Sequence, residues 1–325
     1  MLYNFLILGL GLVLLVWGAH WLVHGAAKLA RAMGISPLVI GLTVVAYGTS
    51  SPELVVNISA ALAGNTDIAI GNVIGSNIFN VLFILGLCAI ILPLKVGKNL
   101  IWLDVPIMIA VSGLLYVFCL DYRLSQLEGA MLILGVFIYT LFCFSNSKKE
   151  KLAAQDEFNK EFGGNVEQLK KPALIVRDIF FIVGGLVLLV FGSKYLVDAS
   201  VAIARYMGVS ELVIALTIIA AGTSLPEVAT SVVATIKGER DIAIGNVVGS
   251  NIYNILAILG VTALISKGGL PINPASINLD IPFMFFVAII CYPVFRSHSS
   301  ILRWEGLLFL SLYVGYTVYL VQSSH

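Results

Sequence analysis

The sequence predicts an all-α membrane protein with ten transmembrane helices, arranged as two inverted repeats of five helices each. The composition, the number of apolar runs and an internal repeat lead to this prediction. Of the 325 residues, 59% are hydrophobic and 11% are charged, whereas charged residues make up about 25% of a typical soluble domain. The net charge of +1 gives no reason to expect a nucleic-acid partner.

Ten apolar runs are long enough to cross a bilayer, because a spanning helix needs about 20 apolar residues. These runs cover roughly residues 3–24, 37–62, 68–93, 101–120, 127–145, 176–198, 211–236, 242–266, 279–296 and 302–321. The first run has no Lys or Arg before it, so we expect a retained span rather than a signal peptide. The polar segment 146–173 predicts a first repeat over 1–145, a linker over 146–173 and a second repeat over 174–325.

The two halves repeat one another in sequence. At a fixed offset of 174 residues, 29 of the 50 positions in residues 38–87 are identical to residues 212–261, without a gap. The identities include Thr, Pro, Glu, Asp and Asn, which chance similarity between apolar helices does not keep in register. Because each repeat has an odd number of spans, the second starts on the opposite side of the membrane, and the repeats are inverted about an axis in the membrane plane.

The positive charges predict how the chain is oriented. With ten spans, fifteen of the nineteen Lys and Arg residues fall on the side of the linker. The positive-inside rule places that side in the cytoplasm. We therefore expect a multi-pass protein of the cytoplasmic (inner) membrane, with the linker 146–173 inside and both termini outside.

A six-residue motif recurs in the middle of one apolar run in each half, at residues 48–53 and 222–227. Both copies read Gly-Thr-Ser-x-Pro-Glu. An acidic residue at the centre of a spanning helix costs about 2.5–3.5 kcal/mol on insertion scales. We therefore expect Glu53 and Glu227 to face a partner, a cavity or an ion. The alternative is a pair of protonated acids that only hydrogen-bond neighbouring helices.

The same motif predicts a break in the second and the seventh helix. Its proline lacks an N–H and clashes with the preceding turn, and its glycine adds backbone freedom. The break residues are Gly48, Pro52, Gly222 and Pro226. All donors around the break are oxygens, which Ca²⁺ and Na⁺ prefer and which disfavour zinc and copper. Beside the two carboxylates, they are the hydroxyls of Thr49, Ser50, Thr223 and Ser224 and the carbonyls near Ala46 and Ala220.

The next span of each half carries a second motif, at residues 71–80 and 245–254. In each copy a serine and an asparagine lie four residues apart, on one face of a helix. These residues are Ser76, Asn80, Ser250 and Asn254. Their neutral oxygens can bind an ion together with the glutamates without adding negative charge. The alternative is that these residues form hydrogen bonds between helices. A glycine before each serine permits a close helix approach or a local break, so we expect the third and the eighth helix to be broken too.

Other acidic residues in the spans are expected to have structural roles. Asp104 and Asp280 precede a proline at the beginning of a predicted span, and we expect them to cap those helices. The sequence has no paired-aspartate protease motif, no HExxH motif and no buried Ser-His arrangement, so an intramembrane enzyme is not expected.

The two motif pairs resemble the α-repeats of the Ca²⁺/cation antiporter superfamily, and the whole chain is similar to the prokaryotic sodium/calcium exchangers. The resemblance implies alternating-access exchange of Na⁺ against Ca²⁺, with these transported ions and no further cofactor. It implies Ca²⁺ ligands at Glu53, Glu227, Thr49 and Thr223. It implies Na⁺ ligands at Ala46, Ser50, Ser76, Asn80, Ala220, Ser224, Ser250, Asn254 and the two glutamates. The expected partners are these ions and the lipid bilayer, and no obligate protein partner is evident.

Coupling to H⁺ or to K⁺ is the alternative within this interpretation, and a cation channel is a remote one. Several relatives, including potassium-dependent exchangers, carry Asp at the position of Asn254, and proton/calcium exchangers have an acid in the Gly-Asn helix motif. Both copies here have asparagine, which favours Na⁺. Channels build their pore from several subunits or from a charged ring, so inverted repeats with broken helices fit a transporter better.

Overall fold

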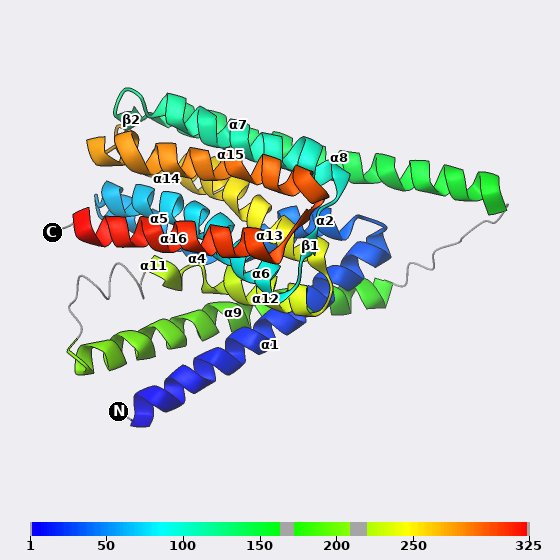
Figure 1. Ribbon diagram of the computed structural model, residues 1–325, viewed down its shortest axis with the longest axis horizontal. Helices are drawn as coiled ribbons and strands as arrows, with labels where there is room; N and C mark the ends of the chain where they lie inside the picture. The colour runs from blue at the N-terminus through cyan, green and yellow to red at the C-terminus, as the bar shows by residue number, and fades with distance from the viewer. Residues whose placement is uncertain (1, 163–171, 209–219, 324–325) are drawn as a thin grey trace.

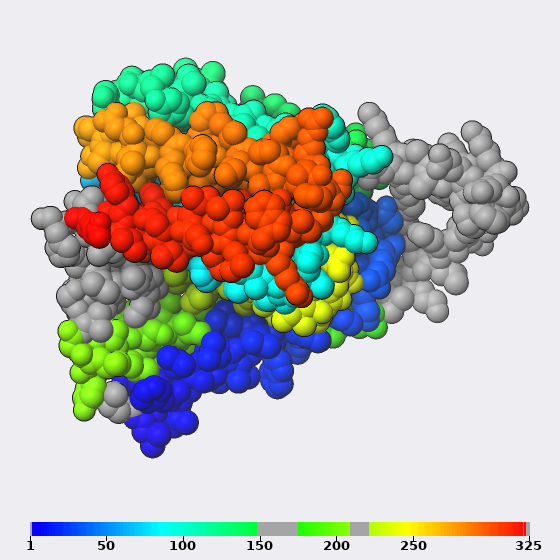
Figure 2. Space-filling model, viewed as in Figure 1, coloured from blue at the N-terminus to red at the C-terminus, as the bar shows by residue number. Residues whose placement is uncertain are grey.

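The computed structural model describes residues 2–162, 172–208 and 220–323 and is a bundle of helices with two very short β-ribbons (Figure 1). α1 (Leu2–Met33) and α9 (Pro172–Tyr206) lie side by side along one flank of the bundle. In the space-filling view these two helices form the lower edge, and α15 (Ile281–His298) and α16 (Arg303–Ser323) cover the front (Figure 2).

The remaining elements follow the predicted order of spans. Those of the first half are α2 (Pro37–Ile40), η1 (Gly41–Val45), α3 (Ala46–Thr49), α4 (Ser51–Leu62), α5 (Thr66–Phe79), η2 (Asn80–Leu85), α6 (Gly86–Ile91), β1 (Leu94–Lys95), η3 (Leu100–Asp104), α7 (Val105–Phe118), β2 (Arg123–Leu124) and α8 (Gln126–Phe162). Those of the second half are α11 (Ala220–Gly222), α12 (Leu225–Ile236), α13 (Arg240–Tyr253), η5 (Asn254–Leu259), α14 (Gly260–Ile265), β3 (Leu270–Pro271), η6 (Ser276–Asp280) and β4 (Ser300–Ile301).

Two helices, α2 and α8, begin at residues that are typical of helix starts. The Ser36 hydroxyl accepts the Leu38 N–H at 3.3 Å, and a proline follows it at the first helical position. The Glu128 carboxylate accepts the N–H of Ser125 at 2.7 Å, three residues earlier. This is the reach-back contact of a capping box.

Within the described residues, seven helices are long and apolar enough to cross a membrane, or eight if the bent pair Pro37–Thr49 and Ser51–Leu62 is one span. α16 occupies the tenth predicted run. Residues 211–219 of the seventh predicted run lie outside the described residues, and the remainder of that run contains α11 and α12. The all-α membrane character is thus established, and the count of ten spans stays a prediction.

The predicted breaks in the third and the eighth helix are wrong. The stretches Thr66–Ile91 and Arg240–Ile265 are each one continuous helix. Neither stretch contains a proline, so every residue keeps an N–H for the helical ladder. Each instead contains a π-helical segment, η2 or η5, which accommodates an extra residue without interrupting the helix.

The expected capping role of Asp104 and Asp280 is also wrong. Each aspartate ends a π-helical segment inside a longer helix, Leu100–Phe118 or Ser276–His298, and so does not stand at a helix start. The Tyr139 hydroxyl donates to Asp104 at 3.2 Å, and the Tyr316 hydroxyl donates to Asp280 at 3.0 Å. These bonds tie neighbouring helices together.

The two halves interlock at both ends of the bundle. β1 pairs with β4, and β2 pairs with β3, so each half contributes one strand to each antiparallel ribbon. The ribbons lie at opposite ends of the bundle (Figure 1). α1 begins and α16 ends at one end, whereas α8 ends and α9 begins at the other.

α1 and α9 touch through glycines. A Cβ added at Gly18 would lie 2.8 Å from the carbonyl oxygen of Gly185, and one added at Gly185 would lie 2.7 Å from that of Gly18. Gly11 and Gly192 face each other in the same way. Backbone-to-backbone contact of this kind allows two spanning helices to pack closely over their length.

Candidate ion-binding site

The second predicted helix is broken where the sequence predicts it. The segments Pro37–Thr49 and Ser51–Leu62 meet at an angle of 44°. Pro52 stands in the first turn of α4, followed by Glu53. The second copy follows the same plan, because Pro226 and Glu227 stand in the first turn of α12. Both glutamate side chains are only 1% exposed, so the break places two acids inside the protein.

The two motifs bind each other through reciprocal hydrogen bonds. The Ser50 hydroxyl donates to Glu227 Oε1 at 2.8 Å. The Ser224 hydroxyl donates to Glu53 Oε1 at 3.0 Å. The same pair of residue types therefore meets twice, each time across the two halves of the chain.

The threonines of the motif make a second reciprocal pair of contacts. The Thr49 hydroxyl donates to Asn246 Oδ1 at 3.0 Å, and the Thr223 hydroxyl donates to Asn72 Oδ1 at 3.3 Å. These asparagines are not among the predicted site residues, although both belong to the repeated second motif. Their equivalent positions in the two copies are the signal that would have found them.

Two further asparagines join α5 to α13 at the centre of the bundle. The Asn77 amide donates to the Asn251 carbonyl oxygen, and the Asn251 amide returns the bond to the Asn77 carbonyl oxygen, both at 3.2 Å. Their Oδ1 atoms accept the side-chain amides of Asn254 and Asn80, both at 3.0 Å. Asn77 and Asn251 are not among the predicted site residues, but they hold the predicted residues Asn80 and Asn254 in place.

Five buried oxygens around this centre have no hydrogen-bond partner among the described residues. They are Oε2 of Glu53, Oε2 of Glu227, Oδ1 of Asn80, Oδ1 of Asn254 and Oγ of Ser250. Leaving a buried polar group unpaired costs about 1–3 kcal/mol, and more for a charged group. Carboxylate, amide and hydroxyl oxygens are the donors that Ca²⁺ prefers, so this set of atoms fits a hard cation.

The structure places the other predicted site residues around the same centre, with one difference. Ser76 Oγ lies 3.1 Å from Ser224 Oγ, within hydrogen-bond distance. The Ala46 carbonyl, however, is not freed, because it accepts the N–H of Ser50 at 3.0 Å. Pro52 has no N–H to donate, so the carbonyl that loses its helical partner is the one four residues earlier, on Gly48.

In the second copy of the motif, the equivalent carbonyl accepts a hydrogen bond from a side chain of another helix. Gly222 is the residue four positions before Pro226, and its carbonyl accepts the Ser193 hydroxyl of α9 at 2.7 Å. The predicted ligand Ala220 is the first residue of α11. Ala220 is the equivalent of Ala46 at the offset of 174 residues.

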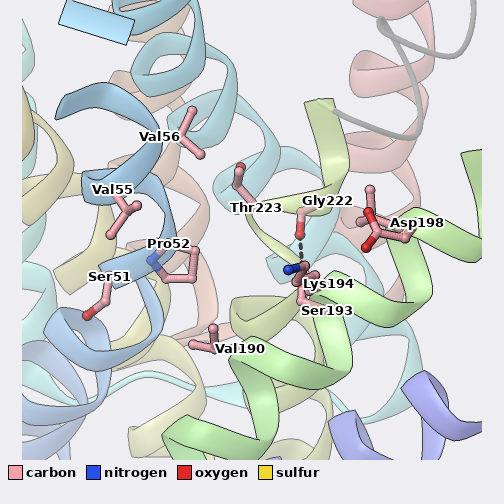
Figure 3. A pocket seen from close by; sticks show the side chains of 11 residues that line it. Ser51, Pro52, Val55, Val56, Val190, Ser193, Lys194, Asp198, Gly222 and Thr223 are labelled. Carbon is pink, nitrogen blue, oxygen red and sulfur yellow. Dashed lines mark hydrogen bonds between the residues drawn. The ribbon is translucent and has the colours of Figure 1, made fainter. Parts of the chain in front are cut away.

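A cavity of about 380 Å³ lies beside the second copy of the motif (Figure 3). It lies between α4, α9 and α11, and it reaches Gly222 and Thr223. Thr223 is half-buried, whereas its equivalent Thr49 is 1% exposed. The other lining residues are Ser51, Pro52, Val55, Val56, Val190, Ser193, Lys194, Val197 and Asp198.

The equivalent face of the other half is closed. There α1 packs on α12, and Ala19 and Val23 of α1 are fully buried in a cluster that also contacts Leu225 and Ala229. A cavity thus adjoins the site between α9 and α4, whereas α1 packs on α12 at the equivalent place. Two halves of similar sequence adopt different packing on the two sides of the same pair of acids.

Comparisons with known proteins agree with this geometry. A family model described as sodium/calcium exchanger protein matches residues 3–145 and 178–322. The sodium/calcium exchanger MaX1 of Methanosarcina acetivorans is 36% identical over an alignment of 345 residues that covers 98% of each chain. The inner membrane protein YrbG of Escherichia coli is 37% identical over 280 residues, which cover 86% of this chain and 85% of YrbG.

Solved structures give the same result for the fold. The sodium-calcium exchanger NCX_Mj, soaked with zero Na⁺ and Ca²⁺, matches with a TM-score of 0.82 and 32% sequence identity. The match covers 98% of this chain and 98% of that one.

Proposed function

This chain belongs to the sodium/calcium exchanger protein family, and on that premise we propose that it is a secondary antiporter that exchanges Na⁺ for Ca²⁺ across the cytoplasmic membrane. One observation carries the proposal: Glu53 and Glu227 meet at the centre of the bundle, each with one oxygen bonded to a serine of the opposite half and one oxygen unpaired. MaX1 and NCX_Mj are named as exchangers of these two ions.

The charge at this centre accounts for exchange. Two ionised glutamates carry a charge of −2, which one Ca²⁺ or two Na⁺ neutralise. Uncompensated buried charge is costly, so the loaded forms of the carrier are favoured over the empty form. A carrier that crosses only when loaded exchanges its ions and does not leak them.

We assign the ligands from the resemblance of the two motif pairs to the α-repeats of the family. The Ca²⁺ ligands are Glu53, Glu227, Thr49 and Thr223. The Na⁺ ligands are these glutamates together with Ser50, Ser76, Asn80, Ser224, Ser250, Asn254 and the carbonyls of Ala46 and Ala220. Support comes from the unpaired oxygens of both glutamates, both of these asparagines and Ser250. A carbonyl has a second lone pair, so the bonded Ala46 carbonyl still has capacity for an ion.

Transport then proceeds by alternating access between two inverted repeats, 1–145 and 174–325, joined by the linker 146–173. In this proposal the chain has ten spans, and both termini and the open cavity face outward. The covered side between α1 and α12 faces the cytoplasm. α1 and α9 move as one unit, since their glycine contacts join them closely, and their shift uncovers α12 while it covers α4.

The proposal is tested by ion-gradient swaps in proteoliposomes. We expect an outward-directed Na⁺ gradient to drive ⁴⁵Ca²⁺ uptake, whereas K⁺ and H⁺ gradients of the same size do not. Uptake driven by a proton gradient would assign the chain to H⁺/Ca²⁺ exchange, and a requirement for K⁺ would assign it to the potassium-dependent exchangers. Calcium flux without any counter-ion would indicate a channel.

A further inference from the structure

One buried hydroxyl stands outside the reciprocal network of the two motifs. Thr230 lies on α12, three residues after Glu227, and its side chain is 0% exposed. Its Oγ1 atom has no hydrogen-bond partner among the described residues. Buried helical threonines elsewhere in the described chain satisfy this group, since Thr43, Thr235 and Thr262 each donate to the carbonyl four residues earlier.

The internal repeat relates Thr230 to a residue of the open cavity. The offset of 174 residues that equates Ser50 with Ser224 and Glu53 with Glu227 equates Val56 with Thr230. Val56 lines the cavity between α4 and α9, and Figure 3 shows its side chain beside this cavity, facing Thr223. The reciprocal hydrogen bonds of the two motifs support this equivalence in three dimensions.

The face of α12 that bears Thr230 is covered by α1. In the internal repeat, α1 is the equivalent of α9, which lines the open cavity. Ser193 and Val197 of α9 line the cavity. Their equivalents at the same offset are Ala19 and Val23 of α1, which are fully buried against the neighbourhood of α12. At present α9 lies apart from α4 and leaves a cavity between them. If α1 shifted to the same position relative to α12, a passage would open along Thr230.

We propose that Thr230 coordinates the cation in the passage between the central site and the inner end of the bundle, a role that rests on the proposed exchange function. Beyond Glu227, Thr230 is the first residue of α12 whose side chain has an oxygen, since Val228 and Ala229 have none. An ion that leaves the glutamates regains its water shell stepwise, and a hydroxyl oxygen replaces one water on the way. The outer passage has valine at this place, so the two faces of the protein bind cations differently.

Thr230→Val is the decisive variant, because it gives the inner passage the residue that the outer passage already has. Everted vesicles present the inner face to the medium, and right-side-out vesicles present the outer face. We expect Thr230→Val to raise the apparent KM for Ca²⁺ at the inner face about threefold to tenfold, in line with one lost oxygen contact to a charged group. The outer-face KM stays at its wild-type value, and Thr230→Ser restores the inner-face value.

Two further variants complete the test. Thr262→Val makes the same chemical change at a threonine whose hydroxyl donates a hydrogen bond to the Ile258 carbonyl. We expect this control to leave both KM values unchanged. Val56→Thr is the mirror variant, which lowers the outer-face KM and leaves the inner-face KM unchanged. If Thr230→Val does not accumulate in the membrane, Thr230→Ala takes its place.

An unchanged inner-face KM in Thr230→Val, or an equal shift at both faces, would overturn the role of Thr230 and leave the exchange function intact. Absence of Na⁺-driven Ca²⁺ flux in the wild-type protein would instead overturn the proposed function, and the role of Thr230 with it.

Discussion

The hydroxyl of Ser50 donates a hydrogen bond at 2.8 Å to the carboxylate of Glu227, which lies 177 residues further along the chain. The equivalent bond from Ser224 to Glu53 measures 3.0 Å. Each bond occupies one oxygen of a glutamate and orients the other oxygen, which has no protein partner within the described residues. The serines therefore position the acids as well as supplying oxygens of their own.

Neutralising either acid is expected to abolish exchange. Glu53→Gln or Glu227→Gln removes one of the two carboxylates proposed to neutralise the bound cation, and removing one partner of a buried pair of opposite charges costs about 2–5 kcal/mol. We expect Na⁺-driven ⁴⁵Ca²⁺ uptake to fall about 100-fold or more. Glu128→Gln is the matched control, because Glu128 contacts the N-terminal end of its own helix, and it keeps wild-type uptake. Full activity in either site variant contradicts the assignment of these ligands.

The two serine variants are expected to differ in severity. Ser50→Ala loses one hydrogen bond to a carboxylate, at a cost of about 1.5–3 kcal/mol. Ser224→Ala loses the equivalent bond and also the contact of Ser224 with Ser76 at 3.1 Å. We expect a higher apparent KM for Ca²⁺ in both variants and a larger increase for Ser224→Ala. Equal KM values in the wild type and both variants would show that the serines do not position the glutamates.

Cation binding is expected to raise thermal stability. A ligand at 100 times its Kd stabilises the folded state by about 2.7 kcal/mol. In detergent we expect Ca²⁺ to raise the Tm of the wild type and of Glu128→Gln by a few degrees. Glu227→Gln should show little or no increase with Ca²⁺. An equal shift in all three proteins would mean that Ca²⁺ binds elsewhere.

The glycine contact between α1 and α9 gives a prediction about motion. A Cβ at Gly18 would lie 2.8 Å from the Gly185 carbonyl oxygen, whereas one at Gly9 meets nothing within 4 Å. Overpacking costs about 1–3 kcal/mol, so Gly18→Ala should lower the Tm and slow exchange. Gly9→Ala makes the same change in open space and should leave exchange at the wild-type rate. Identical behaviour of the two variants would argue against close α1–α9 contact.

The bond from Ser193 to the Gly222 carbonyl, at 2.7 Å, is expected to hold α9 in the position that leaves the cavity open. The equivalent of Ser193 in α1 is Ala19, which has no hydroxyl. Loss of one neutral hydrogen bond costs about 0.5–1.5 kcal/mol. Ser193→Ala should therefore reduce thiol labelling of a Val56→Cys reporter from the outside about twofold to tenfold.

That labelling experiment needs a background without the four buried native cysteines, Cys88, Cys119, Cys143 and Cys291. Ser311→Ala is the control, because Ser311 donates to the Leu307 carbonyl within exposed α16, and labelling should not change. Stronger labelling in Ser193→Ala would mean that the bond favours the closed arrangement.

The sequence by itself determined the class of the protein, its family and the location of one helix break. Low charge and long apolar runs require a bilayer, and a proline inside an apolar run interrupts a helix at Pro52 whatever surrounds it. The paired motifs led to the family that the comparisons confirm. These features are local, since they depend on composition and on neighbours within a few residues.

The tertiary structure decided which residues meet and which side of the site is open. Asn72 and Asn246 contact the threonines of the opposite half, and such contacts span more than 150 residues of chain, which no local pattern encodes. The glycines of the second motif led to the wrong prediction that the third and the eighth helix are broken, whereas both helices are continuous. Nearly equal sequences also pack unequally, with α1 on α12 and a cavity between α9 and α4. Because one rigid pair of helices cannot cover both faces at once, this asymmetry exists only in the folded molecule.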